Sequence, residues 1–133
     1  MEPAANRPKA ITYHKQSKTL ELTYDDDAVS IPAELLRVYS PSAEVRGHAP
    51  EERKLQTGKK HVGIARIDPV GNYAVRIEFD DGHDTGLYAW DFLHDLGVNA
   101  QMYWDDYVKE INAANASRLP SIPLGHWSPS DSG

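Results

Sequence analysis

Four side chains that could bind a metal ion or a substrate lie within five consecutive residues. They are Asp80, Asp81, His83 and Asp84. Carboxylates and imidazole are common ligands of divalent metal ions. A calcium-binding loop is excluded, because it needs glycine at its sixth position, whereas Gly82 is the third residue here. Two interpretations remain open: His83 takes part directly in binding, or Asp81 and Gly82 form a hairpin bend whose carboxylates accept backbone N–H groups.

No complete catalytic motif occurs elsewhere in the sequence. There is no Gly-x-Ser-x-Gly segment, and Ser30, Ser40 and Ser42 lie in capping contexts without a neighbouring histidine. There is also no glycine-rich phosphate loop and no His-x-Asp/Glu motif of a non-haem iron site. The other histidines are scattered through predicted loops and helices: His14, His48, His61, His94 and His126. The sequence leaves enzymatic activity undecided and favours a role without catalysis.

Composition excludes several further classes of function. The chain of 133 residues has a net charge of −6 and a pI of about 5.4, and it has no stripe of Lys and Arg to bind nucleic acid. It contains no cysteine, so disulfides, thiolate metal sites and cysteine nucleophiles are excluded. No apolar run approaches the length of a membrane span, and the N-terminal residues lack the apolar core of a signal peptide. We therefore expect a cytoplasmic protein that binds neither nucleic acid nor membranes.

The acidic turn follows a segment in which apolar and polar residues alternate. One face is predicted to carry Tyr73, Val75, Ile77 and Phe79. The opposite face is predicted to carry Ala74, Arg76, Glu78 and Asp80. Such alternation is typical of a half-buried antiparallel strand. Gly71 and Asn72 tolerate positive φ, which predicts a hairpin with a preceding strand that contains Val62 and Ile64.

The remaining elements are predicted to be short. Alternation with period two indicates strands over 11–13, 19–24 and 29–31. Helical spacing and helix-end signals indicate helices over 33–38, starting at Pro32, over 90–96, ending at Gly97, and over 100–114. Together these elements predict an α+β fold: a small antiparallel sheet with two or three helices packed on it.

Three polar segments are expected to lie outside these elements. Residues 42–60 are rich in Gly, Pro and charge and predict a long mobile loop. Residues 1–8 and 117–133 are predicted to be a disordered lead-in and a disordered tail, which leaves 9–116 as the domain.

Aromatic residues are concentrated near the two later helices. They are Tyr88, Trp90, Tyr103, Trp104 and Tyr107. Most are expected to lie in the core. Trp104 falls away from the helical face of Tyr103 and Tyr107, so it is either a core residue or an exposed anchor for a partner protein.

Two segments carry a resemblance to a known family. They are LRVYSPSAEVRGH (36–48) and VGNYAVRIEFDDGHDTGLYAWDFL (70–93). The chain resembles a stand-alone bacterial member of the DUF971 family, which is similar to the N-terminal domain of gamma-butyrobetaine hydroxylase. The resemblance covers about residues 8 to 110. It implies a small domain without the double-stranded β-helix domain that catalyses hydroxylation, so hydroxylase activity is not expected.

The resemblance also bears on metal binding. In the hydroxylases this domain holds a structural zinc through three cysteines and one histidine. The corresponding positions here are Ser40, Ser42 and Val45, and the histidine corresponds to His83. One ligand of four therefore remains, and hydroxyl groups are poor zinc ligands. We expect His83, as a remnant of such a site, to connect the hairpin to the segment after the first helix by a hydrogen bond.

The resemblance favours a non-catalytic binding or adaptor domain, a protein–protein module with a link to iron–sulfur or metal metabolism. Similar modules are fused to P-loop ATPases that carry iron–sulfur clusters, which makes such a carrier a candidate partner. The candidate binding residues are Arg37, Asp81, His83, Asp84, Tyr88 and Trp90. No cofactor is predicted. One alternative is a metal-binding accessory domain, for iron or zinc, of an oxidoreductase such as a gamma-butyrobetaine hydroxylase-like dioxygenase; another is a small-molecule binder with residues 42–60 as its lid.

Overall fold

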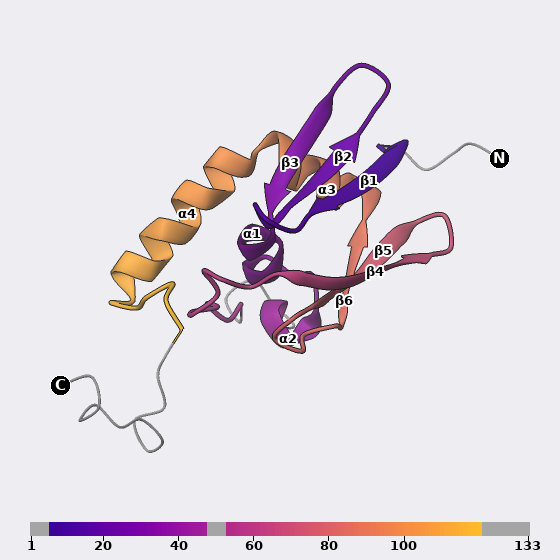
Figure 1. Cartoon of the computed structure of the whole chain (residues 1–133). Helices are drawn as coiled ribbons and strands as arrows, with labels where there is room; N and C mark the ends of the chain where they lie inside the picture. The colour runs from indigo at the N-terminus through magenta and orange to yellow at the C-terminus, as the bar shows by residue number, and fades with distance from the viewer. Residues whose placement is uncertain (1–5, 48–52, 121–133) are drawn as a thin grey trace.

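The computed structural model describes residues 6–47 and 53–120, and it shows an α+β fold with two antiparallel three-stranded sheets (Figure 1). The first sheet has the order β1 (Ala10–His14), β2 (Thr19–Thr23), β3 (Ala28–Pro32). The second has the order β4 (Ile64–Val70), β5 (Ala74–Phe79), β6 (Gly86–Ala89). The helices are α1 (Ala33–Val38), α2 (Ala43–Arg46), α3 (Trp90–Val98) and α4 (Ala100–Ala113). The predicted fold class is confirmed, with the strands divided between two sheets.

Both sheets contribute to one hydrophobic core. Leu20, Leu22 and Ile31 of the first sheet belong to the same buried cluster as Ile77 and Phe79 of the second. Helices α3 and α4 complete the cluster with Leu93, Leu96, Tyr107 and Ile111. Burial of this apolar surface is the main force that holds the two sheets together.

Helix α1 lies inside this arrangement, and all six of its residues are buried. It follows β3 directly, because Pro32 has the extended conformation of a residue that precedes a helix. Two of its buried residues are charged: Glu34 is 6% exposed and Arg37 is 8% exposed. A buried charge is costly unless it is paired, so α1 can be accommodated only if other parts of the chain supply an anion and a cation.

The second sheet confirms most of the predicted hairpin and corrects one residue. Val75, Ile77 and Phe79 are buried, as the alternation predicts. Tyr73 was expected beside them but lies in the turn between β4 and β5, where it is 71% exposed. Tyr73 belongs to the turn because β5 begins only at Ala74, after Gly71 has reversed the chain at φ +54°.

Gly97 was expected to end a helix, and this prediction is wrong. Helix α3 continues through Gly97 to Val98. A Cβ atom on Gly97 would lie 2.6 Å from Cγ2 of Val29, so this glycine allows α3 to pack closely against β3. Close approach rather than helix termination explains the residue.

Part of the predicted loop over 42–60 is helical. Ser42 caps the short helix α2, and its side-chain oxygen accepts the N–H of Glu44. Residues 48–52, which include His48, lie outside the described residues, as do 1–5 and 121–133, which include His126. No helix in the described ranges is long and apolar enough to cross a membrane.

The segment that follows the predicted domain boundary at residue 116 contacts the rest of the chain. The carbonyl groups of Ser117 and Arg118 accept hydrogen bonds from the N–H groups of Gly58 and Lys60, at 3.0 and 2.9 Å. Composition alone suggested disorder, because the segment is rich in Ser and Pro, but these contacts place Ser117 to Pro120 with the folded part of the chain.

Candidate functional site

The acidic turn is joined to α1 by an ion pair. Oδ2 of Asp81 accepts hydrogen bonds from Nε of Arg37 at 2.9 Å and from Nζ of Lys59 at 2.6 Å. Its Oδ1 accepts the backbone N–H of His83 at 3.1 Å. Arg37 uses a second nitrogen to reach Oε1 of Gln56 at 3.1 Å. Asp81 therefore supplies the anion that the buried guanidinium of α1 requires.

The turn has the geometry of the hairpin-bend interpretation. Asp81 and Asp80 both accept backbone N–H groups, Asp80 from Gly63 at 3.0 Å. Gly82 has φ +92°, a conformation that L residues rarely adopt. The two carboxylates are thus used within the protein, and a direct role of His83 stays a prediction.

Opposing effects set the pKa of Asp81. Burial raises the pKa of this carboxyl. The hydrogen bonds from Lys59 and from the His83 N–H, together with Arg37, lower the pKa by more than burial raises it, so it falls to about 2. Because the folded state binds its proton less tightly than the unfolded state, the contribution of Asp81 to stability is fully present above about pH 4. It is lost as the pH falls towards 2.

His83 is connected to the segment after α1, as the sequence predicted. Its Nε2 lies 2.9 Å from Oγ of Ser40, and its Nδ1 lies 3.2 Å from a carboxylate oxygen of Glu44. Burial of the imidazole and the positive charge of Arg37 lower the pKa of His83, against the opposing effect of Glu44. A carboxylate can only accept, so neutral His83 donates from Nδ1 to Glu44 and accepts the Ser40 hydroxyl proton at Nε2.

Ser40, His83 and Glu44 therefore have the hydrogen-bonding order of a nucleophile, a base and an orienting carboxylate. This corrects the expectation that no histidine lies next to Ser40: the two residues are 43 positions apart in sequence but adjacent in space. Ser40 is 0% exposed, although it borders a recess of about 600 Å³. A substrate carbonyl cannot reach its Oγ, so the arrangement is better suited to holding the structure together than to hydrolysis.

The backbone of β6 passes directly against this serine. A Cβ atom on Gly86 would lie 2.5 Å from Oγ of Ser40 and 3.0 Å from the Tyr88 ring. Only glycine leaves room for the serine side chain here. Gly86 therefore allows the backbone of β6 to pass close to the side chain of Ser40.

The donor set at this place does not fit a zinc ion. Oγ of Ser42 lies 2.6 Å from Oγ1 of Thr85 and also caps α2, so it is already used. Val45 offers no ligand atom, and no group of three or more His, Cys, Asp or Glu side chains suited to a metal occurs within residues 6–47 and 53–120. Ser40, Ser42, Val45 and His83 are nonetheless all buried, as ligands of a closed structural site would be.

The other candidate binding residues have structural contacts. Tyr88 donates its hydroxyl to the carbonyl of Leu36 at 2.5 Å, and Trp90 donates its indole N–H to the carbonyl of Asn72 at 2.7 Å. Both are buried, whereas Asp84 is partly exposed. The structure brings Arg37, Asp81 and His83 together, whereas Tyr88, in β6, and Trp90, at the start of α3, make separate contacts. Direct binding by any of these residues stays a prediction.

Sequence reasoning missed exposed apolar side chains on the second sheet and in the turn before β5. We call this set the sheet surface and define it by Val70, Tyr73 and Leu87. All three are exposed. Leu87 pairs with Arg76 across β5 and β6, and Val70 pairs with Ala74, so both point to the side opposite Val75 and Ile77. The placement of Tyr73 in the turn could not be seen from the alternation, which extended the strand by one residue.

Comparison with protein families gives one match over most of the domain. A family described as gamma-butyrobetaine hydroxylase-like, N-terminal, matches residues 11–94, a range that includes α1 and the acidic turn. No curated protein gives a significant match.

Solved structures are similar over longer stretches. Two NMR solution structures each share 48% identity with this chain, with TM-scores of 0.77 and 0.73. The matched regions span 90% and 92% of this chain, and 94% and 93% of the two solved chains, respectively. A crystal structure from Acidithiobacillus ferrooxidans, of a DUF971 protein of unknown function, shares 33% identity and a TM-score of 0.59, over 73% of this chain and 98% of that one.

Substitution of Asp81 should change how stability depends on pH. We expect the free energy of unfolding of the unmodified protein to fall by about 1–2 kcal/mol more between pH 4 and pH 2 than that of Asp81→Asn. Urea denaturation at a series of pH values measures this difference. Asp84→Asn is the control, because it removes the same charge from the same turn and leaves the Arg37 and Lys59 contacts intact. Equal pH dependence of Asp81→Asn and the unmodified protein would show that the pKa of Asp81 is not depressed by folding.

Three cysteines should create a zinc site at this place. We expect the combined variant Ser40→Cys, Ser42→Cys, Val45→Cys to bind one Zn²⁺ per chain with a Kd of about 1 µM or tighter under reducing conditions. Cobalt substitution and its tetrahedral absorption bands report the ligand geometry. Adding His83→Gln should shift these bands and weaken metal binding, because water then takes the fourth position. A folded triple variant without them, or with bands that do not depend on His83, would show that the four positions do not converge.

Proposed function

The chain belongs to the gamma-butyrobetaine hydroxylase-like N-terminal family, DUF971. We propose that it is a non-catalytic module that binds another protein through the sheet surface. Members of unknown function provide no activity to transfer. The proposal therefore rests on the residues of this chain.

The exposed apolar side chains carry the proposal. Tyr73 and Arg76 are of the residue types that contribute most to protein interfaces. Leu87, which pairs with Arg76, adds exposed apolar area. Val70 extends the apolar area along β4. A partner with a complementary apolar patch would remove these side chains from water, and that burial supplies the driving force.

The buried candidate residues support this surface from behind. Arg37 and His83 hold the turn that joins β5 to β6, and Trp90 holds the turn that carries Tyr73 through its bond to Asn72. Substitution of these residues is expected to affect binding by displacing the strands. Loss of binding by such variants alone would therefore not identify them as contacts.

An iron–sulfur carrier ATPase is the candidate partner that the family resemblance suggests, and the proposed setting is the cytoplasm. The chain has no cysteine, so it would contact such a carrier without holding a cluster through thiolates. The alternative role as a metal-binding accessory domain is not favoured by the side chains around His83, because the hydroxyls of Ser40 and Ser42 already form hydrogen bonds within the protein.

Affinity capture from native cells tests the sheet surface. We expect Tyr73→Ser with Leu87→Ser to reduce the amount of a specifically captured protein about tenfold or more, because two central apolar contacts are removed. Val98→Ser with Met102→Ser is the matched control, since these side chains are similarly exposed but lie on α3 and α4. Quantitative mass spectrometry measures capture, and melting temperatures check that both variants are folded. Undiminished capture by the sheet variant, or equal loss in the control, would contradict the proposal.

A further inference from the structure

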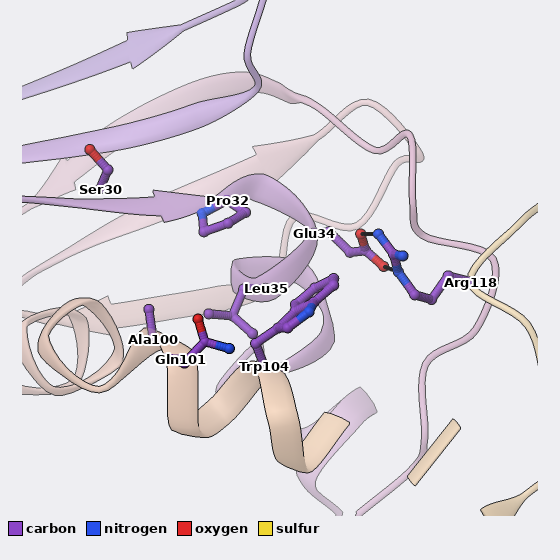
Figure 2. A pocket seen from close by; sticks show the side chains of 8 residues that line it. All are labelled: Ser30, Pro32, Glu34, Leu35, Ala100, Gln101, Trp104 and Arg118. Atoms are coloured by element: carbon purple, nitrogen blue, oxygen red, sulfur yellow. Dashed lines mark hydrogen bonds and ion pairs between the residues drawn. The ribbon is translucent and has the colours of Figure 1, made fainter. Parts of the chain in front are cut away.

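Glu34, the second buried charge of α1, is paired with Arg118 in the segment after α4. The carboxylate of Glu34 accepts two hydrogen bonds from Arg118, Nε to Oε2 and Nη2 to Oε1, each 2.8 Å long (Figure 2). This paired arrangement matches the planar fork of a guanidinium and is poorly matched by an ammonium group. Glu34 is 6% exposed with Arg118 in place, so its carboxylate faces the guanidinium in a mostly water-free setting.

The same guanidinium lies over an aromatic ring. Cζ of Arg118 is 4.6 Å from the centre of the Trp104 ring, which projects from α4 towards Glu34 (Figure 2). Trp104 is half-buried and packs against the core, so it is neither wholly a core residue nor a free anchor. A carboxylate and an indole face together form a site with the charge and shape of a guanidinium.

The site continues into open space. A recess of about 470 Å³ is bordered by Glu34, Trp104 and Arg118 and extends along Pro32 and Gln101. Arg118 itself keeps 33% of its side chain exposed. The guanidinium therefore occupies one end of a larger recess that solvent can enter.

Few interactions hold the segment that supplies Arg118. It follows α4 after Asn115, whose φ of +54° reverses the chain. Its backbone is bound by the N–H groups of Gly58 and Lys60, which donate to Ser117 and to Arg118. The next residue, Leu119, is exposed. The groups that receive the segment lie on α1, α4 and residues 58–60. Trp104 packs against the core, and Lys59, between Gly58 and Lys60, is bonded to Asp81 of the acidic turn.

We propose that Glu34, Trp104 and the N–H groups of Gly58 and Lys60 form a receptor for an extended segment containing arginine, and that Arg118 occupies it in cis. The partner is a protein whose own arginine displaces Arg118. Two backbone carbonyls of that segment, one from the arginine and one from the residue before it, replace those of Arg118 and Ser117. This receptor is separate from the sheet surface, so either proposal can fail without the other.

Removal of the internal arginine tests the receptor. The probe is the peptide acetyl-Ser-Arg-amide, and binding is followed by the NMR signal of the Trp104 indole N–H. We expect Arg118→Ala to bind this peptide about ten- to a hundredfold more tightly than the unmodified protein, where Arg118 competes for the site. Failure of folded Arg118→Ala to bind the peptide saturably would overturn the proposal.

Two controls separate guanidinium recognition from general adhesion. Acetyl-Ser-citrulline-amide has nearly the same shape without the charge, and we expect at least tenfold weaker binding to Arg118→Ala. Glu34→Gln in the Arg118→Ala background should weaken binding of the arginine peptide by a similar factor. Equal binding of both peptides, or binding that is unaffected by Glu34→Gln, would contradict the assignment.

A further arm uses the unmodified protein and decides the matter if Arg118→Ala does not fold. At millimolar concentrations the arginine peptide should displace Arg118, and the Nε–H signal of Arg118 should shift towards that of a solvent-exposed arginine. The citrulline peptide should leave this signal unchanged. An unchanged Arg118 signal at the highest peptide concentration would show that Arg118 is a fixed structural contact.

Discussion

Two opposite charges buried on one short helix govern this structure. Helix α1 is too short to be stable alone and is covered on all sides, so it depends on tertiary contacts for its stability. Arg37 and Glu34 would each be costly to bury without a partner. Their partners come from distant parts of the chain: Asp81 lies 44 residues beyond Arg37, and Arg118 lies 84 residues beyond Glu34. Pairing these charges fixes the acidic turn relative to the core and brings the segment after α4 against α1.

The acidic turn is therefore better explained by structure than by catalysis. Once Asp81 is paired with Arg37, the next turn residues place His83 against Ser40 and Thr85 against Ser42. Hydrogen bonds among neutral groups thus join the chain segments that the resemblance to the hydroxylases would assign to a metal site. Such bonds need no cysteine and no metal supply. The side chains of Asp81, His83 and Thr85 are thus used within the protein, which argues against a further ligand at these three residues.

Local patterns allowed much of the fold to be predicted from sequence, and the errors arose where distant residues decide. Alternation located β5, and the resemblance to the hydroxylases suggested a hydrogen bond from His83 to the segment after α1, where the structure has Ser40 as the partner. Alternation could not show that Tyr73 belongs to a turn, because the boundary depends on where β4 stops pairing. Composition suggested a disordered tail from Ser117. The ion pair of Arg118 with Glu34 could not be foreseen, because it joins residues that no local pattern connects. The same limitation hid the proximity of Glu44 to His83.

The dependence of α1 on its ion pairs can be measured most directly by a double-mutant cycle on Arg37 and Asp81. The free energy of unfolding is compared for the unmodified protein, Arg37→Met, Asp81→Asn and the double variant. If Asp81 is the counterion that allows Arg37 to be buried, each single substitution should destabilise the protein by about 2–4 kcal/mol. The double variant should then be about 2 kcal/mol more stable than the sum of the single effects predicts. Effects that add to within about 0.5 kcal/mol would show that the two charges are independent, and would contradict this account of the turn.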